Sequence, residues 1–234
     1  MPREREGGGR LPGQVLQILA KDLRVEWRSR EIIYTMVLFA ALVVLMFAFA
    51  LGSEAPPRGS VVGGILWIVV AFTGSLGLSR LFDGERERRG ASALLLACSS
   101  PAAIYLAKLA GVLLFVGVVE AVVLPLMVLL FDLALPAPGL LALTLLLGTL
   151  GFCAVGTLFS AGLMQARGRA VLLSILLFPI ATPVIVAGSK ATAALLSSPV
   201  APDQAMVWIK LLVVFDAVFV TLSLWAFGPL LRED

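Results

Sequence analysis

The sequence predicts an all-α, polytopic membrane protein with six transmembrane helices, preceded by an amphipathic helix at the membrane surface. Of its 234 residues, 60% are hydrophobic and 14% are charged, and the mean hydropathy is +1.03. These values exceed what a soluble domain needs for its core. Six apolar segments also reach about 20 residues, the length that crosses roughly 30 Å of hydrocarbon as a helix. They lie at about 32–51, 61–79, 109–131, 140–164, 171–188 and 207–229.

The region before the first span divides into two parts. Residues 1–13 contain three consecutive glycines preceded by four charges, a composition typical of a disordered tail. Residues 14–31 alternate apolar and charged side chains at helical spacing, which predicts an amphipathic cytoplasmic interfacial helix. This helix serves either as a basic anchor for the first span or as a contact for a partner, and the sequence leaves both open. The apolar positions are Leu16, Leu19, Ala20, Leu23 and Trp27.

The distribution of positive charge predicts the topology. Fifteen of the 18 Lys and Arg residues fall on one side of the six-span arrangement, whereas only Arg58 and Lys190 fall in the opposite loops. Because Lys and Arg accumulate in cytoplasmic loops, both termini are expected in the cytoplasm. The net charge of +3 therefore reflects topology, and nucleic acid is not expected as a partner. The fifteen lie in residues 1–31 (seven), 80–108 (five), the loop of Arg167 and Arg169 (two) and the tail, Arg232.

Small residues in the fourth span predict close helix packing. They repeat every four positions from Thr149 to Ala161, and Gly148, Gly151 and Gly156 lie beside them. Such a surface lets two helices approach closely within a membrane. The contact is expected mainly within the chain, although contact between copies stays open.

Two prolines predict an irregular fifth span. Pro179 and Pro183 lie inside the apolar segment, and proline removes a backbone N–H from a helix. A broken or hinged helix is therefore expected at 171–188.

The residue types present exclude many kinds of chemistry. The chain has no histidine, which excludes Ser-His-Asp and Cys-His nucleophile pairs and His-based zinc or haem ligation. It also has no G-x-x-x-x-G-K-[ST] phosphate loop. The two cysteines, Cys98 and Cys153, lie in different environments and are not expected to pair. We therefore predict a protein that is not an enzyme, binds no metal or cofactor directly, and takes its energy from another chain or an ion gradient.

Three ionisable residues lie inside predicted spans. Glu120 falls at the middle of the third span and Asp216 near the middle of the sixth, with Lys210 close to the external end of the sixth. Charged side chains at the membrane centre are costly and usually face the bundle interior. The two carboxylates act either as a proton relay or as polar links between spans, and Lys210 is expected to extend outward along its own stem.

The loop at 80–108 carries the densest charge in the chain. A helix from about Glu85 to Leu96 is expected there, with a charged first half in water and leucines against the membrane or the bundle. Such a segment is either a topology signal or a surface that a soluble partner binds. The candidate contact residues are Asp83, Glu85, Arg86, Glu87, Arg88, Arg89, Leu94 and Leu95.

The same region resembles the CcmB family, the membrane subunits of a haem exporter-type ABC transporter in cytochrome c maturation. The resemblance covers roughly residues 14–231. Its more specific part consists of Arg86-Glu87-Arg88-Arg89-Gly90-Ala91, Leu94-Leu95-Leu96-Ala97, Ala103-Ile104-Tyr105-Leu106-Ala107-Lys108-Leu109, Val119-Glu120 and Leu124-Pro125-Leu126.

This resemblance implies an ABC-2-type permease fold over residues 32–231 and a coupling helix in the loop 80–108. It implies a separate CcmA-like cytoplasmic ATPase that holds the ATP, CcmC-like and CcmD-like membrane partners, and a periplasmic haem chaperone. Haem would be handled by the complex, with its iron ligands on the partners, in the bacterial inner membrane. Glu120 matches a glutamate of the family, whereas Ser92 and Ala93 stand where the family usually carries a leucine and an acidic residue.

Other functions stay open beside this one. An ABC-2-type permease that exports a lipid, a drug or a glycan shares the same physical features. An ion-coupled carrier would use Glu120 or Asp216 and would need no ATPase.

Overall fold

The computed structural model describes residues 11–29, 31–51, 59–82, 100–197 and 199–230. Every regular element in these ranges is a helix, and six of them are long and apolar enough to cross a membrane. The predicted all-α fold with six spans is thereby confirmed. The helices are α1 (Leu11–Ser29), α2 (Glu31–Leu51), α3 (Gly59–Arg80), α6 (Pro101–Phe131), α7 (Pro138–Gly162), α8 (Arg169–Leu195) and α9 (Pro202–Leu230).

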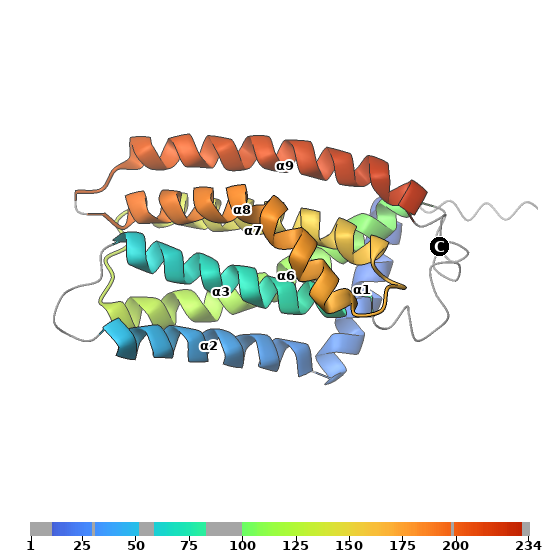
Figure 1. The fold of residues 1–234 in the computed structure, drawn as a ribbon, viewed down its shortest axis with the longest axis horizontal. Coiled ribbons are helices and arrows are strands. Elements are labelled where there is room, and N and C mark those ends of the chain that lie inside the picture. Colours follow the sequence, from blue (N-terminus) through green and yellow to red (C-terminus); the bar gives the residue numbers. More distant parts are fainter. Residues whose placement is uncertain (1–10, 30, 52–58, 83–99, 198, 231–234) are drawn as a thin grey trace, which may run out of the picture.

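The six long helices run side by side, and α1 lies across one end of the bundle (Figure 1). We call this the α1 end. The chain leaves α3, α7 and α9 there and enters α2, α6 and α8 (Figure 1). Helices α3 and α7 form the centre, because 67% and 61% of their most apolar windows are buried, against 17–28% in the other four.

Several helix boundaries differ from those predicted, and three of them bear on the site. Helix α1 begins at Leu11, inside the segment that was expected to be disordered. Helix α6 begins at Pro101 rather than near residue 109, so that the last residues of the predicted loop 80–108 are helical. Helix α8 continues to Leu195, beyond the predicted end at 188. The start of α6 and the end of α8 were misplaced because Lys108 and Lys190 were counted as loop charges. Both lysines lie inside helices.

Helix α8 is continuous through both of its prolines, so of the two predicted alternatives the break is wrong and the hinged helix is found. The helix instead bends in its middle (Figure 1). Pro179 and Pro183 provide no N–H for the carbonyls one turn earlier, and this loss permits a bend without ending the helix.

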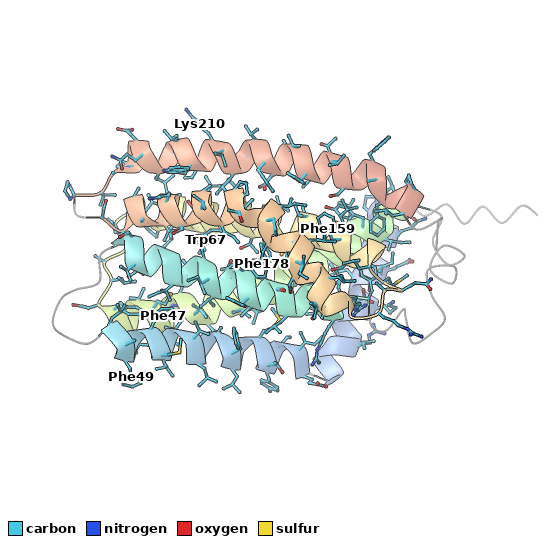
Figure 2. All side chains as sticks on the ribbon, viewed as in Figure 1. Phe47, Phe49, Trp67, Phe159, Phe178 and Lys210 are labelled. Atoms are coloured by element: carbon cyan, nitrogen blue, oxygen red, sulfur yellow. The ribbon has the colours of Figure 1, made fainter. Side chains whose placement is uncertain are left out.

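The centre of the bundle is built around Trp67 of α3. Its indole is 1% exposed, and it lies between α7 and α8 (Figure 2). A Cβ atom on either Gly148 or Gly188 would overlap the indole ring, so only glycine leaves room for it. The indole Nε1 donates a hydrogen bond of 3.1 Å to Thr192 Oγ1 of α8. The Trp67 side chain therefore fixes the spacing of α3, α7 and α8. Gly148 of α7 makes its close contact within the chain, as predicted.

Candidate functional site

Two of the last carbonyl groups of α3, and the carbonyl of Leu81 in the turn just after it, are bound by side chains from three other helices. Ser160 of α7 donates to the Leu78 oxygen at 3.0 Å, and Lys108 of α6 donates to the Leu81 oxygen at 3.2 Å. Arg169 of α8 donates to the Ser79 oxygen. We call Lys108, Ser160 and Arg169 the α3 clamp.

The α3 clamp supplies hydrogen-bond donors to carbonyl groups that have no partner at the end of a helix. The last four carbonyls of a helix have no partner within the helix, and cations are favoured at this end by the helix dipole. Two members of the α3 clamp are cations, and each comes from a different helix. The terminus of α3 is therefore fixed to α6, α7 and α8 at once.

Lys108 also connects α3 and α6 to α1. Its side chain is only 3% exposed, and its Nζ lies 2.9 Å from Asp22 Oδ2 of α1. The same ammonium lies 5.2 Å from the centre of the Phe82 ring, within the range of a cation–π interaction. A buried ammonium is stable only when it is paired and hydrogen-bonded, and both conditions are met here. The predicted interfacial helix is thus attached to the bundle by a buried ion pair.

An exposed ion pair lies beside this buried one. Arg80 of α3 and Glu31 of α2 are 2.9 Å apart, with side chains 44% and 69% exposed. Exposed pairs contribute only about 0–1 kcal/mol. The positioning of the α3 terminus therefore depends on the α3 clamp rather than on Arg80.

The α3 clamp lies next to both ends of the segment 83–99. Phe82 is the last described residue before this segment, and α6 starts at Pro101 immediately after it. The predicted contact residues, Asp83 to Leu95, lie outside the described residues, and so do Cys98 and the pair Ser92-Ala93.

Sequence reasoning missed all three members of the α3 clamp. Lys108 and Arg169 were counted as topology charges, Lys108 was quoted besides only within the motif of the family resemblance, and Ser160 was not singled out. One signal was available, because Lys108 stands alone between apolar residues from Ala102 to Val119. A single lysine in such a run indicates a buried, partnered ammonium.

A shallow surface depression adjoins the α3 clamp, and it encloses essentially no space for even a water molecule. Ligand pockets usually span roughly 300–1,000 Å³, so this depression is too small for a drug-sized ligand. The described residues also contain no group of three His, Cys, Asp or Glu that would hold a metal ion. The depression is lined by Leu78, Ser79, Ser160, Leu163, Arg169 and Leu173.

Glu120 contacts a neighbouring span. It is half-buried on α6, and Thr149 Oγ1 of α7 donates a hydrogen bond to its Oε1. The carboxyl therefore links α6 to α7 through one of the small residues that the sequence placed on the packing surface of α7.

Asp216 lies deeper and has no such partner. It is 6% exposed on α9, and neither carboxyl oxygen has a hydrogen-bond partner in the part of the chain that the structure describes. An ionised aspartate at the membrane centre costs about 2.5–3.5 kcal/mol on insertion scales. Lys210 does not offset this cost, because it is exposed and points away from the bundle (Figure 2). The structure thus does not join Glu120, Asp216 and Lys210 into one site.

Comparison with known proteins places these features in a family. The family model described as CcmB protein matches residues 13–234. The heme exporter protein B of Pseudomonas aeruginosa is 28% identical over 174 residues, which cover 74% of this chain and 78% of that protein. The protein of the same name from Haemophilus influenzae is 28% identical over 174 residues, covering 74% and 79%. That of Paracoccus denitrificans is 30% identical over 176 residues, covering 74% and 80%.

Proposed function

Because this chain belongs to the CcmB protein family, we propose that it is the permease subunit of an ABC transporter complex for cytochrome c maturation. The observation that carries this proposal is the family match over residues 13–234. The similar proteins that are named heme exporter protein B support haem as the molecule that the complex handles.

A separate CcmA-like ATPase supplies the energy in this proposal. The sequence contains no phosphate-loop motif of its own. The ATPase binds the charged segment 83–97, and its movement reaches α3, whose terminus is fixed by the α3 clamp. From there Trp67 transmits the displacement to α7 and α8, because its indole fills the space between Gly148 and Gly188. Tightly packed interfaces transmit small shifts in this way.

The complex either moves haem or releases a haem-loaded periplasmic chaperone. Since this chain has no histidine, the iron ligands come from CcmC-like partners and the chaperone, with a CcmD-like protein in the same assembly. The chain lies in the bacterial inner membrane with both termini in the cytoplasm, as the distribution of Lys and Arg supports.

Complementation tests this proposal. The chain is expressed, together with the CcmA-like ATPase of the same genome, in a bacterium that lacks its own CcmB-family protein. We expect mature c-type cytochromes, measured by haem staining of membrane proteins, to return only when the ATPase can hydrolyse ATP. Restoration with a hydrolysis-deficient ATPase would contradict ATP coupling.

A negative result must be separated from poor expression. The amount of inserted chain is therefore measured in the same membranes by immunoblotting. Normal insertion and ATPase binding without cytochrome maturation would instead favour an ABC-2-type permease for another substrate.

A further inference from the structure

We propose that Asp216 is a proton-binding site within the membrane, and that buried hydroxyl groups connect it toward the α1 end. This inference does not depend on the identity of the transported molecule or on the ATPase. It begins with burial, since the Asp216 side chain is enclosed and both of its oxygens lack a hydrogen-bond partner.

The carboxyl group is enclosed by α7 and α8. Its Oδ1 lies 2.5 Å from the place where a Cβ atom would stand on Gly151 of α7, and a methyl group of Val184 of α8 lies 3.2 Å from the same place. Gly151 therefore provides the space that the carboxyl group occupies. The surroundings offer no donor, so an ionised carboxylate would be neither solvated nor paired there.

None of the neighbouring helices neutralises this carboxyl group. Lys108 and Arg169 are engaged in the α3 clamp, and Glu120 accepts from Thr149. Lys190, Asp203 and Lys210 are exposed, and Cys153 and Tyr105 are neutral side chains at neutral pH. These are the charged and titratable groups of α6, α7, α8 and α9 among the described residues. A buried carboxyl without a cation favours its neutral, protonated form.

Two further buried polar groups lie between the level of Asp216 and the α1 end, one on α9 and one on α7. Ser223 follows Asp216 on the same face of α9, and Thr157 lies beyond Gly151 on α7. Both helices run toward the α1 end (Figure 1). The hydroxyls of Ser223 and Thr157 are fully buried, the Ser223 hydroxyl lies next to that of Tyr105 on α6, and the Thr157 hydroxyl has no hydrogen-bond partner among the described residues. Buried polar groups without protein partners, such as those of Asp216 and Thr157, are the setting in which proteins hold buried water.

Hydroxyl groups and water both donate and accept hydrogen bonds, so this row can conduct a proton. The carboxylic acid of Asp216 gives its proton to a water molecule held by Ser223 or Thr157 and is left as carboxylate. Uptake is the reverse step. The rings of Tyr105 and Phe227, 5.3 Å apart, lie one turn beyond Ser223 and close the row toward the α1 end. Proton exchange therefore requires α9 to separate from α6 and α7.

Infrared spectroscopy of the full chain in lipid nanodiscs tests the proposal directly. We expect a carboxylic acid C=O band at neutral pH that shifts when isotope-labelled aspartate is incorporated. This measurement uses the unmodified chain. The absence of a protonated aspartate band would overturn the proposal, because Asp216 would then be ionised.

Matched variants test whether the carboxylic acid band comes from Asp216 and whether protons reach it through the buried hydroxyl groups. Asp216→Asn should remove the aspartate band, whereas Glu120→Gln should leave it. Gly151→Ala should shift its frequency, because the new methyl group displaces Oδ1, and Gly117→Ala, whose Cβ meets nothing within 4 Å, should not.

Ser223→Ala combined with Thr157→Val should slow deuterium exchange at Asp216 without removing the band. An aspartate band that survives in Asp216→Asn would overturn the assignment of the band to Asp216. An unchanged exchange rate in the double variant would overturn the route through the hydroxyl groups.

Discussion

The ammonium group of Lys108 lies 2.9 Å from the carboxylate of Asp22 and joins α6 to α1. The same group donates to the Leu81 carbonyl at the end of α3. One buried side chain thus connects three helices beside Phe82, the last described residue before the charged segment 83–99. The predicted amphipathic helix is consequently part of the bundle's packing, whether or not it also contacts a partner.

Removing either member of the Lys108–Asp22 pair should destabilise the protein. We expect Lys108→Met and Asp22→Asn each to lower the free energy of unfolding by about 1–3 kcal/mol, because each leaves a hydrogen-bonding group without its partner. The double variant should lose less than the two single losses together. Thermal unfolding in detergent measures all four proteins. Strictly additive losses would show that the two side chains do not interact.

Arg169 should be needed for function more than for insertion. Arg169→Gln removes the cation that binds the Ser79 carbonyl, which loosens the α3 terminus beside the segment 83–99. We expect several-fold less mature cytochrome c with an unchanged amount of inserted chain. Arg167→Gln is the matched control, since Arg167 is exposed two residues away. Equal effects of the two substitutions would argue that only the charge of this loop matters.

The two positions that face the Trp67 ring, 148 and 188, should tolerate only glycine. Gly148→Ala and Gly188→Ala each place a methyl group inside the indole ring, and overpacking of this kind costs about 1–3 kcal/mol. Gly64→Ala should be neutral or stabilising by up to about 1 kcal/mol, because its Cβ meets nothing within 4 Å and alanine favours the helix. Thermal unfolding monitored by size-exclusion chromatography distinguishes them. Equal stability of all three variants would refute the role given to Trp67.

Glu120 should be required for cytochrome c maturation. Glu120→Ala removes the acceptor of the Thr149 hydrogen bond between α6 and α7, and we expect maturation to be abolished while the complex still assembles. Haem staining measures the first and co-purification the second. Thr149→Val removes the same hydrogen bond but keeps the carboxyl group. It therefore distinguishes the effect of losing the hydrogen bond from the effect of losing the acid. Normal maturation in Glu120→Ala would reject the requirement.

Sequence reasoning located the six spans because long apolar runs must be helices in a membrane. It also identified the packing face of α7, since small residues at helical spacing have few other uses in a membrane. It did not find the position of Lys108, because a rule that counts Lys and Arg near span ends assigns every such charge to a loop.

The contacts between helices lay beyond the sequence. Periodicity shows which face of α7 is small, but not that Trp67 of α3 fills it together with Gly188 of α8. The α3 clamp was missed for the same reason, because its members lie far apart in the chain and meet only through the packing of four helices. Asp216 was recognised as an intramembrane acid, whereas its lack of a partner depends on the facing residue being Gly151.

The most direct test of the account is co-purification of the CcmA-like ATPase with this chain. We predict that the unmodified chain retains the ATPase and that simultaneous charge reversal of Glu85, Glu87 and Arg88 releases it, with the chain still inserted in the membrane. Equal retention of the ATPase by the two proteins would contradict a coupling contact through the segment 83–97.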